Sequence, residues 1–302
     1  MTRSWILGIC LALLGCDEAS VGGPDGHTSP DSRPFVDLLR PDGVQPPVLD
    51  LRPGADGKPD PCSPLPAGCL CAQACGAAGQ CDNSPCACQP INGASYGKLT
   101  ALSPCGCDPA THGDMNLLLR KWKAVSATKG LVSVGGATDD KAPQLYTLFV
   151  DERVPQFSNV YQVEQWDWGC NCPKGYITSP EVTLAGMATA LNEVIRAPKS
   201  GYDVGGGNTA IVIHAAKNTI TLKYTGEDNV VQGYTIHLAG ICVEPTLQAL
   251  YDQCHAAGRK ELPALKSKQA LGRAIAAEIQ VSIRDTGSWM DPRVKKDWWQ
   301  GK

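Results

Sequence analysis

The sequence has little phenylalanine, little excess charge of either sign and, after its first sixteen residues, no long apolar run. A formal net charge of −3 excludes a strongly basic nucleic-acid binder, so no nucleic-acid partner is predicted. No later apolar stretch approaches the roughly 20 residues that a transmembrane helix requires. A hydrophobic fraction of 43% nevertheless excludes a chain that is disordered throughout.

Cysteine, glycine and proline are abundant instead. The 302 residues include 15 cysteines, 32 glycines and 23 prolines beside only three phenylalanines. This composition predicts turn-rich, cross-linked structure over part of the chain.

The N-terminus carries the features of an export signal. Arg3 precedes an apolar run over residues 5–14, which is too short to span a bilayer. Residues 13–16 read Leu-Leu-Gly-Cys and resemble the bacterial lipobox, in which the cysteine is lipidated and the preceding residues are removed. The resemblance implies a signal peptide over 1–15 and a lipid anchor on Cys16 that holds the chain at a bacterial membrane, facing the periplasm or the cell surface. An ordinary secretory signal is the alternative.

Two segments without a core of their own follow the signal. Residues 16–61 are dominated by Pro, Gly and Asp, and we expect a disordered linker. Residues 62–108 hold nine cysteines but few bulky apolar residues, which predicts a disulfide-rich segment in an oxidising compartment. Three Cys-x-Cys pairs leave metal binding as an alternative, although no histidine lies among them. Removal of Cys10 and lipidation of Cys16 leave thirteen thiols, so at least one has no partner within the chain.

Residues 109–302 are predicted to form a mainly β domain, an antiparallel sandwich or barrel with one short helix. Short runs rich in Val, Ile, Thr and Tyr alternate with turn residues, as in antiparallel sheets. The runs used for this prediction are 144–150, 160–163, 181–185, 210–214, 219–225, 230–238 and 278–283. Residues 205–208 and 225–229 are predicted turns.

The predicted helix begins after Pro245, with Thr246 as its N-cap, and ends at Gly258. Cys242 precedes this helix and Cys254 lies within it. We expect a disulfide between them, or from them to the Cys170 and Cys172 pair.

Several strings resemble one known family in their order along the chain. Residues 210–214 read Ala-Ile-Val-Ile-His, residues 234–243 read Tyr-Thr-Ile-His-Leu-Ala-Gly-Ile-Cys-Val, residues 268–273 read Lys-Gln-Ala-Leu-Gly-Arg, and residues 278–284 read Glu-Ile-Gln-Val-Ser-Ile-Arg. They resemble the lysostaphin-type zinc endopeptidases, which cut peptide crosslinks of the cell wall. The resemblance covers about 160–293 and implies a small β-sandwich with a duplicated hairpin motif.

The departures from this family bear on function. The family binds zinc through a His-x3-Asp motif and the second histidine of His-x-His, but Glu278 and Gln280 stand at the two His-x-His positions. The aligned stretch has no His-x3-Asp. A catalytic zinc needs three protein ligands and an open position, so no metal site is predicted. Only His237 falls on a functional family position, that of the strand histidine that assists the transition state, and it is the one catalytic candidate.

The sequence therefore predicts a non-catalytic, endopeptidase-like domain that binds cell-wall peptidoglycan or an envelope protein. One alternative is an active cell-wall metallopeptidase whose zinc is held by Asp167, His237 and a Cys or Glu; another is a structural surface protein. Trp166 and Trp168, like the pair at 298–299, could stack on sugar rings, but packing in the core and at the C-terminus is the favoured interpretation.

Overall fold

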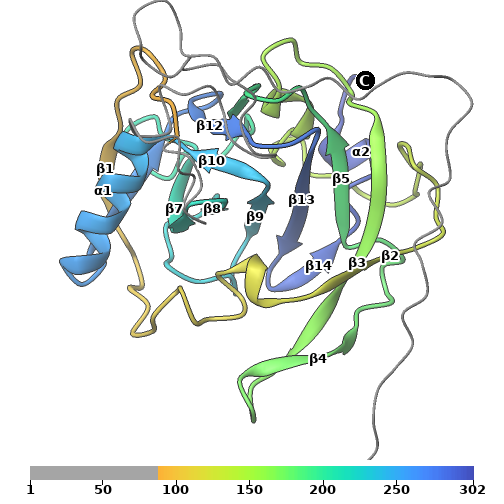
Figure 1. Ribbon diagram of the computed structural model, residues 1–302, viewed down its shortest axis with the longest axis horizontal. Helices are drawn as coiled ribbons and strands as arrows, with labels where there is room; N and C mark the ends of the chain where they lie inside the picture. Colours follow the sequence, from red (N-terminus) through yellow and green to blue (C-terminus); the bar gives the residue numbers. More distant parts are fainter. Residues whose placement is uncertain (1–87) are drawn as a thin grey trace, which may run out of the picture. The chain divides into compact units, whose positions relative to one another are not determined.

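The structure is a computed structural model that describes residues 88–302, and strands dominate this part (Figure 1). The signal peptide 1–15, Cys16, the linker 16–61 and the cysteines of 62–86 lie outside the described residues. Among the described residues, no helix has both the length and the apolar character needed to cross a membrane.

Residues 88–302 form fourteen strands and two α-helices. The strands are β1 (Gly97–Thr100), β2 (Trp122–Ala124), β3 (Phe157–Asp167), β4 (Cys172–Tyr176), β5 (Leu184–Ala188), β6 (Val194–Arg196), β7 (Ala210–Ala216), β8 (Thr219–Lys223), β9 (Tyr234–Ala239), β10 (Ile241–Val243), β11 (Glu261–Leu265), β12 (Ala270–Ala274), β13 (Glu278–Asp285) and β14 (Ser288–Met290). The helices are α1 (Pro245–Ala256) and α2 (Lys295–Trp298), with 3-10 turns η1 (Leu117–Leu119) and η2 (Leu145–Leu148).

The strands form a large sheet and a small one, and neighbouring strands within each run antiparallel. The large sheet has the order β1-β11-β7-β8-β9-β13-β5-β3-β2, with β14 beside β13 and β4 beside β3; the small one has the order β10-β12-β6. Strands β9, β13 and β5 lie side by side in the middle of Figure 1, and β4 extends away from them. The mainly β, antiparallel prediction is confirmed.

The two faces of the large sheet differ sharply in chemistry. On β13, Ile279, Val281 and Ile283 are fully buried in the main hydrophobic core. Because side chains alternate along a strand, the intervening residues Glu278, Gln280, Ser282 and Arg284 face the other way. Ser282 pairs with His237 of β9, which pairs with Thr221 of β8, so this second face is polar.

The main core also takes in the C-terminal end of the chain. Trp298 and Trp299 are 1% and 0% exposed, and their indole N–H groups donate to the carbonyls of Asp291 and Pro292 at 2.9 and 2.8 Å. The helix α2 that carries Trp298 is a second helix beyond the single one predicted.

Most predicted strands coincide with observed strands, and one does not. The runs 160–163, 210–214, 219–225 and 278–283 lie in or overlap β3, β7, β8 and β13, whereas β5 and β9 begin three or four residues later than predicted. The run 144–150 forms η2 instead of a strand. The strand prediction was wrong there because Leu145, Leu148 and Phe149 are all fully buried, and a 3-10 turn brings residues three or four apart to the same side.

The helix α1 lies against β7 and β11 and begins slightly earlier than predicted (Figure 1). Its N-cap is Glu244, whose carboxylate accepts from the backbone N–H groups of Thr246 and Leu247 at 2.8 and 3.0 Å, and not Thr246. A carboxylate is a strong cap because it also complements the positive end of the helix dipole. The predicted ending is confirmed, since Gly258 follows the helix with φ +85°.

The cysteine pairing differs from the expected one. Cys242 bonds to Cys88, and Cys170 bonds to Cys172, while Cys254 is free and buried. The predicted bridge from Cys254 is therefore wrong: its thiol packs in a small apolar cluster with Leu262 and Ile213. Residues 105 and 107 also form a disulfide, so the three described cysteines of the predicted disulfide-rich segment are all oxidised. Strand β1 belongs to the same segment and pairs with β11.

Candidate functional site

His237, the catalytic candidate, sits in the middle of the polar face and is shielded from solvent. It is 1% exposed, and its ring stacks on Trp289 with centroids 5.7 Å apart. The Thr221 hydroxyl donates to the Met115 carbonyl at 2.6 Å, so the 3.0 Å contact between Thr221 and the ring is a donation from Nδ1. Burial, followed by the charge of nearby Arg284, holds the pKa of His237 well below its usual range. The buried, neutral imidazole thus bonds to the neighbouring strand, and the Thr221 hydroxyl joins that strand to residues 105–120, which cover this face.

Glu278 and Gln280 bind each other and strand β3. The Gln280 amide donates to Glu278 Oε1 at 2.9 Å, Tyr161 donates to the same oxygen at 2.8 Å, and Ser158 and Asn159 donate to Oε2. Burial opposes ionisation of this carboxyl, but these donors outweigh it and the pKa of Glu278 is lowered. The carboxylate is thus saturated by protein donors.

The residues proposed for a rearranged zinc site do not come together. Asp167 forms an ion pair with Lys174 at 3.1 Å on the β3–β4 hairpin, and the two cysteines of that hairpin are bonded to each other. Within residues 88–302, no group of three or more His, Cys, Asp or Glu side chains could hold a metal ion. Strand β5, directly beside β13, contributes only Leu, Ala, Gly and Met side chains.

An aromatic and cationic groove lies above the polar face. It consists of two adjoining cavities of about 420 and 310 Å³, both of which are lined by Asp114 and Trp168. We call it the tryptophan groove and define it by Asp114, Arg120, Trp166, Trp168, Arg284 and Trp289, which line the larger cavity. These six residues come from the covering segment 105–120, from β3 and the turn after it, and from β13 and β14.

Trp168 stands at the rim of the groove on a stiffened turn. Its side chain is 54% exposed, and its ring lies 4.8 Å from His112 and 6.3 Å from Trp166, centroid to centroid. The Trp166 indole N–H donates to the Asn171 side chain at 3.1 Å, and the disulfide between residues 170 and 172 closes the same turn. An exposed aromatic ring held in place in this way loses little conformational freedom when a ligand binds.

The floor of the groove is an ion triad. Asp114 Oδ1 accepts from Arg120 at 2.7 Å and from Arg284 at 2.6 Å. Trp289 lies between the two cations, with its ring centroid 5.2 Å from the Arg120 guanidinium and 5.0 Å from that of Arg284. These contacts fix the orientation of both arginines and of the Trp289 ring.

The covering segment is itself anchored at three points. The backbone N–H of Cys105 donates to Asp228 at 3.0 Å, the Thr221 hydroxyl of β8 donates to the Met115 carbonyl, and Arg120 Nη1 donates to the Glu164 carbonyl of β3 at 2.8 Å. Gly113 is required at its position because a Cβ there would overlap the Trp166 ring. The groove is therefore built into the fold and does not depend on a loose loop.

The favoured interpretation of the tryptophans is right for one pair and wrong for the other. Residues 298 and 299 belong to the core, but Trp168 is exposed and Trp166 is only half-buried. Sequence reasoning identified the Trp-Asp-Trp string but missed Asp114, Arg120 and Trp289. Their positions in the sequence carry no signal, since they lie about 50 and 120 residues from the string and meet it only in the folded sheet.

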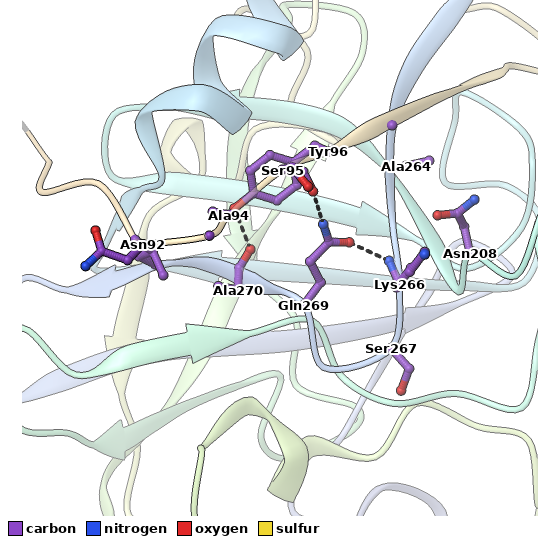
Figure 2. Close-up of a pocket in the computed structure, with 13 residues that line it drawn as sticks. Asn92, Ala94, Ser95, Tyr96, Asn208, Ala264, Lys266, Ser267, Gln269 and Ala270 are labelled. Atoms are coloured by element: carbon purple, nitrogen blue, oxygen red, sulfur yellow. Dashed lines mark hydrogen bonds between the residues drawn. The ribbon is translucent and has the colours of Figure 1, made fainter.

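A second cavity, of about 670 Å³, lies between the chain around Tyr96 and the β11–β12 turn (Figure 2). Figure 2 shows the Gln269 amide reaching across it: the nitrogen donates to the Ser95 carbonyl at 2.6 Å and the oxygen accepts from the Lys266 backbone at 2.7 Å. The Tyr96 hydroxyl donates to the Ala270 carbonyl at 2.8 Å. The polar groups of Gln269 and Tyr96 are already hydrogen-bonded within the protein, so the tryptophan groove is the better candidate for ligand binding.

No protein-family model, no curated protein and no solved structure matches this chain.

Proposed function

We propose that this chain is a lipid-anchored bacterial envelope protein whose β domain binds cell-wall peptidoglycan in the tryptophan groove without cutting it. The observation that carries the proposal is the convergence of Trp166, Trp168 and Trp289 on one open, polar-floored groove. Sugar rings present apolar C–H faces and polar edges, and aromatic rings beside charged groups complement both.

We propose that the domain does not cleave peptidoglycan because of two residues on the polar face of the sheet. At the two positions where the endopeptidase family has the His-x-His imidazoles, Glu278 and Gln280 hydrogen-bond to each other. A carboxylate already saturated by donors from β3 is poorly placed to bind zinc. The order of strings that resembles the family thus supports a shared fold with a different use.

The lipid anchor is proposed from the Leu-Leu-Gly-Cys string at residues 13–16. Expression of the full-length precursor in a bacterial host should place the protein in the membrane fraction. Cys16→Ser should release it into the soluble envelope fraction, and equal membrane association of both forms would contradict the anchor.

Binding is tested by co-sedimentation of the purified chain with insoluble peptidoglycan. Trp168→Ala should weaken binding about tenfold or more, because an exposed aromatic anchor is removed. Leu191→Ala is the matched control, since Leu191 is also 54% exposed but lies outside the groove. Equal sedimentation of Trp168→Ala and wild type would reject the groove as the binding site. Release of soluble fragments together with stoichiometric zinc would reject the non-catalytic role.

A further inference from the structure

We infer that the ligand of the tryptophan groove carries a carboxylate, which binds against the guanidinium groups of Arg120 and Arg284. This inference rests on the proposed function and specifies its ligand as an anionic glycan. It identifies a subsite within the groove, at its floor beside Trp289.

The charge balance of the groove floor favours an anionic ligand. Two guanidinium groups share a single carboxylate oxygen, Asp114 Oδ1, so the triad carries one uncompensated positive charge. The other ionic pair of the groove region, Asp167 with Lys174, is balanced by itself. The side chains of Arg120 and Arg284 are only 3% and 7% exposed, and an unbalanced charge with so little access to water favours a bound counter-ion.

Both arginines also keep N–H donors that could bind such a ligand. A guanidinium has five N–H groups. Arg120 makes three hydrogen bonds, to Gly113, Glu164 and Asp114, and Arg284 makes three, to Asp114 and twice to Gly287. Each arginine thus keeps two N–H groups beyond these bonds, and planar pairs of N–H groups match a carboxylate.

The titration behaviour of the surrounding groups agrees with a positive potential. Burial lowers the pKa of Arg120 to about 10; Asp114 opposes this shift and Arg284 adds to it. The ring of His112 accepts a hydrogen bond from the backbone N–H of Asp114. The pKa of His112 is also lowered, first by burial and further by the charges of Arg120 and Arg284.

The other residues that line the cavity favour a glycan as the molecule that carries the carboxylate. Ser179 and Ser288 line the same cavity with hydroxyl groups, and the tryptophan rings provide flat apolar faces next to the cations. The acidic side chains of a protein segment offer the charge but have no ring of their own for these faces. Peptidoglycan offers both, because carboxylates of its peptide stems lie next to its sugars.

The test compares native peptidoglycan with the same material after its carboxyl groups have been converted to neutral methylamides. Wild-type protein should bind the neutral material about tenfold more weakly, which is the loss of one charge-assisted contact. Equal binding to both materials overturns this inference and leaves the proposed function standing. Failure to bind native material overturns both. Competition by polyglutamate but not by carboxylate-bearing glycan fragments overturns the choice of a glycan.

A variant that should bind more tightly distinguishes ligand recognition by the two arginines from a purely structural role. Asp114→Asn removes the competing carboxylate and should strengthen binding to native peptidoglycan several-fold, with no gain on the methylamide. Asp252→Asn, on the exposed surface of α1, makes the same change in net charge away from the groove and should change neither. Weaker binding by Asp114→Asn, in protein that circular dichroism shows to be folded under the conditions of the binding assay, would contradict the inference. The comparison of the two materials with wild-type protein needs no variant to fold.

Discussion

The buried ion pair between Asp228 and Arg259 makes a sharp prediction about stability. The two residues are 0% and 3% exposed, and both Asp228 oxygens accept from Arg259 at 2.7 Å. Arg259 also donates to the Ile213 carbonyl of β7, and Asp228 accepts from Cys105, where the covering segment begins. The pair therefore ties together the β8–β9 hairpin, the end of α1 and the base of the groove.

Asp228→Asn keeps the shape of the side chain but leaves the Arg259 guanidinium buried without its counter-charge. Removing one partner of a buried ion pair costs about 3–5 kcal/mol, and the amide oxygen that remains places this substitution near the lower end, at about 3 kcal/mol. With a urea dependence of about 2 kcal/mol per molar, the midpoint should fall by roughly 1.5 M.

The assay is urea unfolding of the full chain, followed by tryptophan fluorescence and circular dichroism. Glu261→Gln is the matched control: it removes one charge from the Lys98–Glu261 pair, whose N–O distance is 2.6 Å but whose side chains are 44% and 52% exposed. Solvent screening makes such a pair weak, so its midpoint should hardly move. If Asp228→Asn unfolds at the same urea concentration as Glu261→Gln, the reasoning from burial is refuted.

Three further predictions concern the groove, pH and the disulfides. Gly113→Ala should displace the Trp166 ring and weaken peptidoglycan sedimentation severalfold, whereas Gly106→Ala, which meets no atom within 4 Å, should leave binding unchanged. Burial lowers the pKa of His214 to about 4, so the unfolded chain binds more protons than the folded chain between pH 6.5 and 4. The free energy of unfolding should therefore fall by up to about 3 kcal/mol as the pH is lowered over that range. In urea titrations at several pH values, His214→Gln should make this fall smaller. Cys242→Ser opens a bridge with a sequence separation of 154 and should cost about 3–5 kcal/mol in the same assay, and an unchanged midpoint would show that this bridge does not constrain the unfolded chain.

The class of fold and much of the local structure could be predicted from short stretches of sequence. Strands such as β7, β8 and β13 can be predicted because each is a short run rich in β-branched residues and bounded by turn residues, and these are local properties of the sequence. The end of α1 at Gly258 is local in the same way. The lipidation of Cys16 and the relation to cell-wall endopeptidases stay predictions, made from the order of short strings.

The contacts between residues far apart in the sequence became known from the folded structure alone. Cys242 could bond to any accessible thiol, and its partner Cys88 is selected by the path of the chain along the sheet edge, not by spacing. The tryptophan groove unites Asp114, Trp168 and Trp289 for the same reason: strand pairing places Trp168 and Trp289, and the ion pair with Arg284 holds Asp114 of the covering segment beside them. Such contacts depend on strand pairing over more than a hundred residues. The pattern of a single segment records which side chains it must bury, but not which other segments will cover them.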